Sequence, residues 1–344
     1  MNSLWNRRVL LGSLAASLAA TGFVIWGTQE PTQAQDANIN LVSYSTPREA
    51  YDKGIIPAFQ TYWKQKTGKT VNFTKSYGAS GAQTRAVTAG LEADVVALSL
   101  AGDVEKLVEA GLVKSDWDKG TYKGMVTNSV VVIATRPGNP KQIKDWADLT
   151  KPGVDIIAPN PRTSGGAQWN VLAIYGAALK GGASPQQAED MLASVFKNVS
   201  VQDKSAREAL QTFINGKGDA LLTYENEILN LAVAAGQVFP YVLPSSTILI
   251  ENPVAIVDKN VDKHGNREVV KAFVDFLYTP QAQEVFAKDG YRPVTAEAAK
   301  KYDAKYKEPA KLFNVEMFGG WSKIATNFFD QSQGIFSRVA QRNR

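Results

Sequence analysis

Residues 154–179 read VDIIAPNPRTSGGAQWNVLAIYGAAL and predict a strand, a turn and a helix in that order. The apolar run Val154–Ala158 is typical of a buried strand, and Gln168–Leu179 of a helix. The intervening turn, Asn160–Ala167, is rich in small residues. In an open α/β sheet such a turn lies at the carboxyl end of its strand, where ligands bind. The stretch therefore predicts an α/β fold with a ligand site at this turn.

The same arrangement occurs twice more, and a fourth candidate lies near the beginning of the folded region. Strand 71–76 precedes Tyr77–Gly81, strand 199–201 precedes Asp203–Ala206, and the first strand meets the first helix at 43–48. Helix starts carry free N–H groups and about half a positive charge. Small residues let an anion approach that backbone. One Ser-Gly turn usually means only a helix cap, but three of them favour an anion site.

Alternating strands and helices predict a largely parallel sheet. The β-branched run 129–134 predicts a long strand, and 248–250 and 253–257 predict two further strands near the other junction. We place chain crossings there, so residues 35–128 plus 249–344 form one predicted lobe and 129–248 the other. A cleft between two lobes is a usual place for a ligand. Residues 48–65 predict a helix that Pro57 kinks or divides.

Composition excludes several classes of function. The chain has 344 residues, a net charge of +5 and no cysteine. Such mild charge without a Lys/Arg run argues against a nucleic-acid partner, and thiolate metal sites are excluded. The one histidine, His264, lies in the polar stretch 262–266 and predicts a surface loop. We expect no metal and no cofactor.

Enzyme signatures are also missing. Gly78–Ala82 lacks the last glycine of a nucleophile elbow, and no P-loop or Rossmann glycine pattern occurs. We therefore predict a binding protein and no catalytic residue. An exported hydrolase remains a remote alternative.

Residues 1–34 predict an export signal. Arg7 and Arg8 precede the uncharged run 9–26, and Thr32–Ala34 resembles a cleavage site. A membrane anchor is the rival interpretation, and the export route stays open. Export through a cleaved signal predicts a periplasmic protein.

The second turn resembles a known family. Asn160-Pro161-Arg162-Thr163-Ser164-Gly165-Gly166-Ala167 is similar to the Asn-Pro-Lys-Thr/Ser-Ser-Gly-Gly-Ala-Arg signature of bacterial periplasmic sulfate-binding proteins. Further similar stretches, in the family's order, are 63–68, 138–143, 224–227, 290–293 and 318–321. The resemblance covers about residues 39–340. It implies a type II periplasmic binding fold, two α/β lobes joined by two crossing strands with sulfate between them, and delivery to the permease subunits of an ATP-driven sulfate importer. We expect a monomer.

The resemblance also implies the ligand-binding residues. It assigns backbone N–H donors to Ser45, Ser80, Gly165, Gly166 and Ala206, and a hydroxyl donor to Ser164. Tyr224 stands where the family has a tryptophan whose indole N–H donates, and a phenol can also donate.

This chain departs from the family's pattern elsewhere too. Gln168 replaces the signature's arginine, Arg162 its lysine, and Ser45 an aspartate that is frequent there. Binding of thiosulfate, molybdate, tungstate or phosphate remains an alternative. Ferric-iron binding on this fold commonly uses paired tyrosines, and the chain has no Tyr-Tyr.

Overall fold

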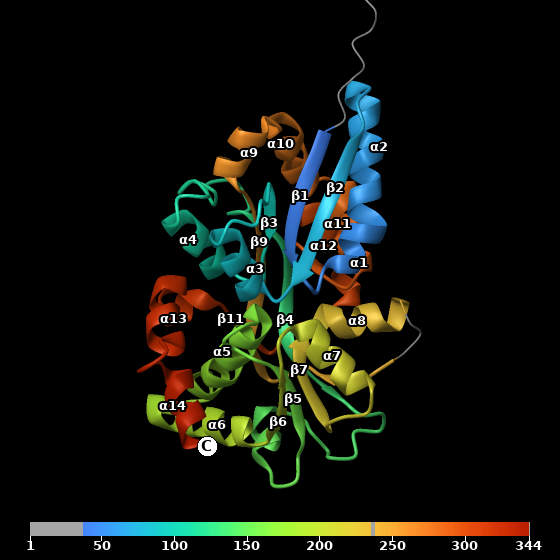
Figure 1. Ribbon diagram of the computed structural model, residues 1–344. Coiled ribbons are helices and arrows are strands. Elements are labelled where there is room, and N and C mark those ends of the chain that lie inside the picture. Colours follow the sequence, from blue (N-terminus) through green and yellow to red (C-terminus); the bar gives the residue numbers. More distant parts are fainter. Residues whose placement is uncertain (1–36, 235–237, 344) are drawn as a thin grey trace, which may run out of the picture. The chain divides into compact units, whose positions relative to one another are not determined.

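The computed structural model describes residues 37–234 and 238–343, which form an α/β fold around one mixed sheet (Figure 1). The strands are β1 (Ala37–Tyr44), β2 (Val71–Gly78), β3 (Val95–Ala97), β4 (Met125–Thr135), β5 (Ile156–Pro159), β6 (Val199–Asp203), β7 (Ala220–Tyr224), β8 (Tyr241–Val242), β9 (Ser246–Ile256), β10 (Arg292–Pro293) and β11 (Lys311–Phe313). The sheet order is β2-β1-β3-β9-β4-β7-β5-β6.

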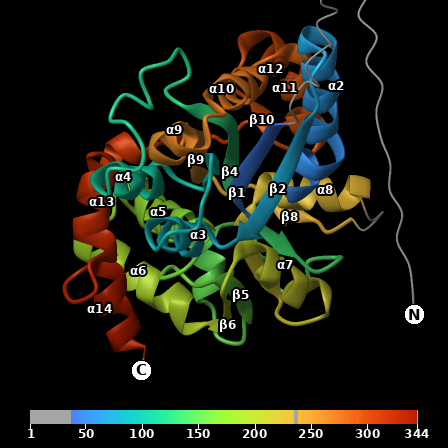
Figure 2. The same cartoon turned by 45° about the horizontal axis from the view of Figure 1, so that its top comes forward.

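Helices connect most of these strands. They are α1 (Arg48–Ala50), α2 (Ile56–Thr67), α3 (Ser80–Thr88), α4 (Ala101–Glu109), α5 (Gly165–Lys180), α6 (Pro185–Lys197), α7 (Ala206–Ile214), α8 (Glu225–Ala234), α9 (Asp258–His264), α10 (Arg267–Phe276), α11 (Pro280–Lys288), α12 (Ala296–Tyr302), α13 (Gly320–Phe329) and α14 (Ile335–Arg342). Figures 1 and 2 both show α14 beside α6, so the end of the described chain packs on its middle. The α/β class predicted from the sequence is confirmed.

The sheet is parallel at both ends and antiparallel in the centre. β1 pairs in parallel with β2 and β3, and β5 pairs in parallel with β6 and β7. The long strands β4 and β9 run antiparallel to each other and to β7 and β3. The prediction of a largely parallel sheet is therefore wrong for the two long strands. β9 runs opposite to its neighbour β3, and β4 runs opposite to its neighbour β7.

Apolar side chains cover both faces of the sheet. Leu41 and Val42 are neighbours on β1 but belong to different core clusters, and so do Ile156 and Ile157 on β5. Successive strand residues point to opposite faces, and a parallel sheet needs helices on both. This explains why the inner strands β3 and β5 consist of nearly continuous apolar residues.

β9 is one strand where the sequence predicts two. The polar pair Glu251-Asn252 interrupts the apolar pattern and led to the prediction of a break. In the structure Asn252 is buried. Its side-chain N–H donates to the Ser99 carbonyl at 2.9 Å, so a polar residue is satisfied inside the strand. Hydrogen bonding to a distant segment thus compensates the burial.

The helix predicted over residues 48–65 is divided by a π-helical segment, Tyr51–Ile55. Pro57 lies at the start of α2, where its missing N–H removes no helical hydrogen bond. The predicted division is therefore present, with the irregular turn just before the proline.

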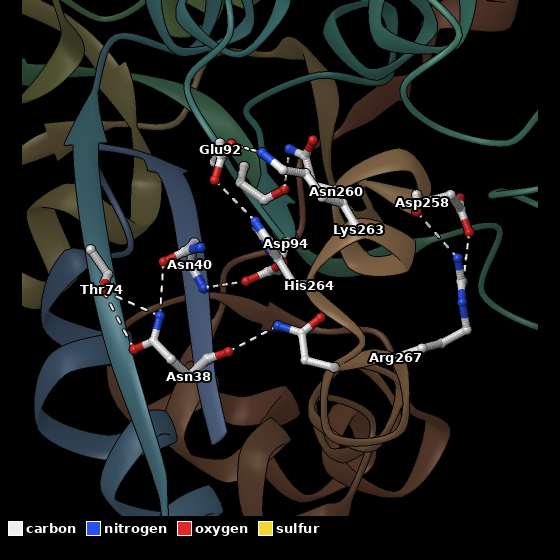
Figure 3. A network of polar contacts seen from close by, with 12 residues as sticks. Asn38, Asn40, Thr74, Glu92, Asp94, Asp258, Asn260, Lys263, His264 and Arg267 are labelled. Carbon is white, nitrogen blue, oxygen red and sulfur yellow. Dashed lines mark hydrogen bonds and ion pairs between the residues drawn. The ribbon is translucent and has the colours of Figure 1, made fainter. Parts of the chain in front are cut away.

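His264 ends α9 and does not lie in a surface loop, which corrects the sequence prediction. Figure 3 shows its ring between two carboxylates. Nδ1 lies 2.7 Å from Asp94 Oδ1, and Nε2 lies 3.0 Å from Glu92 Oε2. Both partners precede β3 and lie about 170 residues away in sequence, so the polar composition around His264 could not reveal them.

Residues 1–34, the predicted export signal, lie outside the described residues. Within residues 37–234 and 238–343, no helix has the length and apolar character needed to cross a membrane.

Candidate functional site

The three predicted turns all lead into helices. Ser164 caps α5, and its Oγ accepts a long hydrogen bond from the Ala167 N–H at 3.4 Å. Ser205 caps α7 in the same way, with the Glu208 N–H as donor at 3.2 Å. α3 begins at Ser80 after extended backbone at Ala79. The first N–H groups of each helix have no acceptor in their own helix, and they include groups that the family resemblance assigns to the ligand.

Gly166 is the residue where the predicted donors meet. A methyl group built on it would lie 3.3 Å from Ala206 Cβ, 3.4 Å from Ser164 Oγ and 3.5 Å from Tyr224 Cε1. These neighbours come from α7, from the cap of α5 and from the end of β7. Four of the seven predicted site residues are therefore in close contact.

The start of α3 joins this group through the turn before α5. The Gly81 N–H donates to the Thr163 carbonyl at 3.1 Å. The Ser80 hydroxyl donates to Asp103 at 2.7 Å and accepts the Ser99 N–H at 3.0 Å. Because both roles of this hydroxyl are used inside the protein, only the backbone N–H of Ser80 is left for a ligand, in keeping with its assignment.

Ser45 follows β1, and the residue after it contacts a side chain from the start of α7. The carbonyl of the next residue, Thr46, accepts a hydrogen bond from Arg207 at 2.9 Å, and Arg207 follows Ala206. The adjoining contacts therefore bring the segments that contain Ser45 and Ala206 together. That the seven residues together bind a ligand stays a prediction.

An arginine and two glutamates surround the start of α7. The Arg207 guanidinium donates to both carboxylate oxygens of Glu49, and it donates to Glu227 at 3.3 Å. The charge of Glu227 raises the pKa of Arg207, and burial raises the pKa of Glu227. A cation in the first turn of a helix is opposed by the helix dipole. The two carboxylates compensate the charge of Arg207, so this side chain is engaged in ion pairs within the protein.

A cavity of about 440 Å³ adjoins the turn before α5. Leu100, Arg162 and Gln168 line it, together with Arg85 from α3. Arg162 and Gln168 are the positions at which the chain departs from the resembled signature, and both lie in the wall of this cavity.

Comparison with known proteins matches residues 39–292 to a family of bacterial extracellular solute-binding proteins. The chain belongs to this family. Members of this family are solute-binding proteins and not enzymes, so the hydrolase alternative is set aside. Among the described residues, no group of three or more His, Asp or Glu side chains could hold a metal ion.

Its relatives cover nearly the whole chain. A sulfate-binding protein of Synechocystis is 45% identical over 96% of this chain and 94% of its own length. A thiosulfate-binding protein of Escherichia coli is 37% identical over 92% of each. The solved sulfate-binding protein SubI of Mycobacterium tuberculosis has a TM-score of 0.79 and 39% identity, covering 86% of this chain and all of its own. These likenesses confirm the predicted periplasmic-binding-protein fold.

Several residues of this solute-binding protein's candidate site were not predicted from the sequence. One of them is Ser99, which lies against Gly165. Its carbonyl accepts hydrogen bonds from Trp169 Nε1 and Asn252 Nδ2, both at 2.9 Å. Arg207 was also missed. None of them lies in a motif with small residues. One available signal was the mostly apolar run 94–98, which is typical of a strand and ends directly before Ser99.

Proposed function

We propose that this protein binds sulfate between two lobes and delivers it to an ATP-driven importer. The observation that carries the proposal is the convergence on Gly166 of the α5 cap, the α7 start and Tyr224. The names of its more similar relatives support sulfate over thiosulfate, since the sulfate-binding relative is 45% identical and the thiosulfate-binding relative 37%.

The proposed lobes are residues 35–128 plus 249–344 and residues 129–248. The antiparallel pair of β4 and β9 supports this division, because the two long strands stand between the parallel ends of the sheet. Ser45 and Ser80 belong to the first lobe, and Ser164, Gly165, Gly166, Ala206 and Tyr224 to the second. Sulfate held from both sides would draw the lobes together.

Neutral groups would hold the dianion. Backbone N–H groups of Ser45, Ser80, Gly165, Gly166 and Ala206, with the Ser164 hydroxyl and the Tyr224 phenol, are the proposed donors. The starts of α3, α5 and α7 together supply roughly 1.5 positive charges, at about half a charge each. Hydrogen bonds to a charged group contribute about 1.5–3 kcal/mol apiece. This set offsets the desolvation of sulfate without a lysine or arginine among the donors.

The proposed cellular role follows from the family. Residues 1–34 would direct export and be removed, and the mature protein would act in the periplasm as a monomer. There it would present sulfate to the permease subunits of an ABC importer in the inner membrane. The family's description as bacterial extracellular solute-binding proteins supports this placement.

Isothermal titration of the stripped mature protein with sulfate, thiosulfate, phosphate and molybdate tests the proposal. Sulfate is expected to bind at about micromolar Kd or below, which corresponds to about 8 kcal/mol. The proposed binding groups include no carboxylate to accept a proton, so phosphate, which carries one at neutral pH, is expected to bind at least about tenfold more weakly. If thiosulfate or molybdate bound most tightly, that anion would be the ligand in place of sulfate. Absence of binding heat with every anion would refute oxyanion binding.

A further inference from the structure

Ser99 is buried at the point where three of the proposed donors meet. Its N–H donates to Ser80 Oγ at 3.0 Å, and its Oγ lies 2.6 Å from the Tyr224 hydroxyl. A methyl group built on Gly165 would lie only 2.6 Å from the same Oγ. Ser99 therefore contacts residues from both proposed lobes.

The backbone of Ser99 is held in place on both sides. Its carbonyl accepts the two hydrogen bonds from Trp169 and Asn252, and its N–H is bonded to Ser80. All of these partners are buried. The Ser99 proton can therefore turn about the Cβ–Oγ bond, while the oxygen stays beside Tyr224.

The two hydroxyls carry two protons, and only one can lie between them. Each hydroxyl has one proton to donate and can also accept. The Asn252 side chain also hydrogen-bonds to the Tyr224 phenol, as a donor. In the part of the chain that the structure describes, neither hydroxyl donates to a carbonyl or carboxylate. Burial raises the pKa of Tyr224, so its proton is retained. One proton of the pair is thus left for a ligand.

We propose that Ser99 is a positioning and specificity-determining residue for the oxyanion: its hydroxyl donates to the phenolic oxygen of Tyr224 and so leaves the Tyr224 proton for the ligand. The inference rests on the proposed function. A phenol is the more acidic of the two hydroxyls, which makes it the better donor to an anion. A chain of hydrogen bonds in one direction also polarises each member.

This arrangement favours anions that carry no proton. With Ser99 donating to it, Tyr224 is set as a donor, which suits fully ionised sulfate. Phosphate has a proton of its own and gains from an acceptor instead. Without the Ser99 hydroxyl, the phenol could turn and accept that proton. Ser99 thereby contributes to discrimination between unprotonated and protonated tetrahedral oxyanions, although it need not touch the ligand itself.

Titration of four mature proteins with sulfate and with phosphate tests the proposal: wild type, Ser99→Ala, Tyr224→Phe and the double variant. Tyr224→Phe should weaken sulfate binding by roughly tenfold or more, the effect of losing one bond to a charged group. Ser99→Ala should weaken it by about fivefold and lower the sulfate-to-phosphate affinity ratio by about threefold or more, roughly half a power of ten. The double variant should bind sulfate no worse than Tyr224→Phe, because residues that act through one another are not additive.

Ser337→Ala is the matched control, since this buried serine donates to the Asp330 carbonyl in the segment before α14. It should change neither the affinity nor the ratio, and its melting temperature without ligand should be close to that of Ser99→Ala. An unchanged sulfate-to-phosphate affinity ratio in Ser99→Ala would overturn the inference. So would a double variant whose loss of sulfate affinity is the product of the two single losses. Both outcomes leave sulfate binding by the wild type intact. Failure of the wild type to bind sulfate would refute the proposed function itself.

Discussion

Arg207 binds both carboxylate oxygens of Glu49, at 3.0 and 2.8 Å, although 158 residues separate them in the chain. The pair joins the first turn of α7 to α1, on opposite sides of the proposed cleft. Arg207 also reaches Glu227, which is 2% exposed. This arginine therefore links the two proposed lobes and compensates a buried carboxylate.

Replacing Arg207 should consequently cost stability. Arg207→Gln leaves Glu227 buried without its cation, and loss of one partner of a buried pair typically costs about 3–5 kcal/mol. Urea denaturation without ligand measures the change. Lys271→Gln is the control, because Lys271 and Asp275 form an exposed pair on α10 that contributes about 0.5 kcal/mol or less. Equal losses in the two variants would show that Arg207 compensates no buried charge.

Three serines at or near helix starts should respond differently to loss of the hydroxyl. Ser164→Ala should weaken sulfate binding by about 1–3 kcal/mol, the usual effect of losing a bond to a charged group. Ser80→Ala should mainly destabilise the fold, because it removes the partner of buried Asp103 and of the Ser99 N–H. Ser184→Ala, at the cap of α6, should cost about 1 kcal/mol of stability and leave affinity unchanged.

Calorimetry for affinity and urea denaturation for stability separate these effects. If Ser164→Ala and Ser184→Ala bound sulfate equally well, the Ser164 hydroxyl would not be a ligand donor.

His264 should make stability depend on pH. Hydrogen bonds with Asp94, and with Glu92, raise the pKa of His264 above its ordinary value. A raised folded-state pKa means that the stabilisation is fully present below the unfolded value, about pH 6.5, and is lost as pH rises through the folded value. Near pH 6 the free energy of unfolding of the wild type should exceed that of His264→Gln by about 1 kcal/mol. This is the usual contribution of an exposed or partly exposed ion pair. Denaturation curves should show this gap closing toward pH 9, whereas a constant gap from pH 5.5 to 9 would mean that the ring stays uncharged.

The sequence predicts those parts of the site that depend on local signals. Ser164, Gly165 and Gly166 are recognised by small residues between a strand and a helix, and their geometry follows from backbone chemistry alone. Ser99 and Arg207 act through contacts with residues 125 and 158 positions away, Tyr224 and Glu49. No local pattern marks such pairs. The same reason explains His264, whose carboxylate partners are brought to it by the packing of α9 against the residues before β3.

Gly165 offers the last prediction, because its side chain is excluded by contact rather than by backbone conformation. Gly165 opens α5 in a backbone conformation that alanine also adopts. A methyl group there would lie 2.6 Å from Ser99 Oγ and 2.7 Å from Ser99 Cβ. Ser99 is held by hydrogen bonds at its N–H and its carbonyl, so it cannot withdraw without breaking them.

Gly165→Ala should therefore lower the free energy of unfolding by about 1–3 kcal/mol, as overpacking of a close-packed site does. It should also weaken sulfate binding by tenfold or more, about 1.4 kcal/mol, since displacing Ser99 disturbs Tyr224 and the α5 start together. Gly120→Ala is the control, because a methyl group on Gly120 meets nothing within 4 Å. Urea denaturation and titration of both variants measure the two effects. If Gly165→Ala were as stable and bound sulfate as tightly as Gly120→Ala, Ser99 would be free to move, and the fixed contact between the loop after β3 and the start of α5 would have no part in binding.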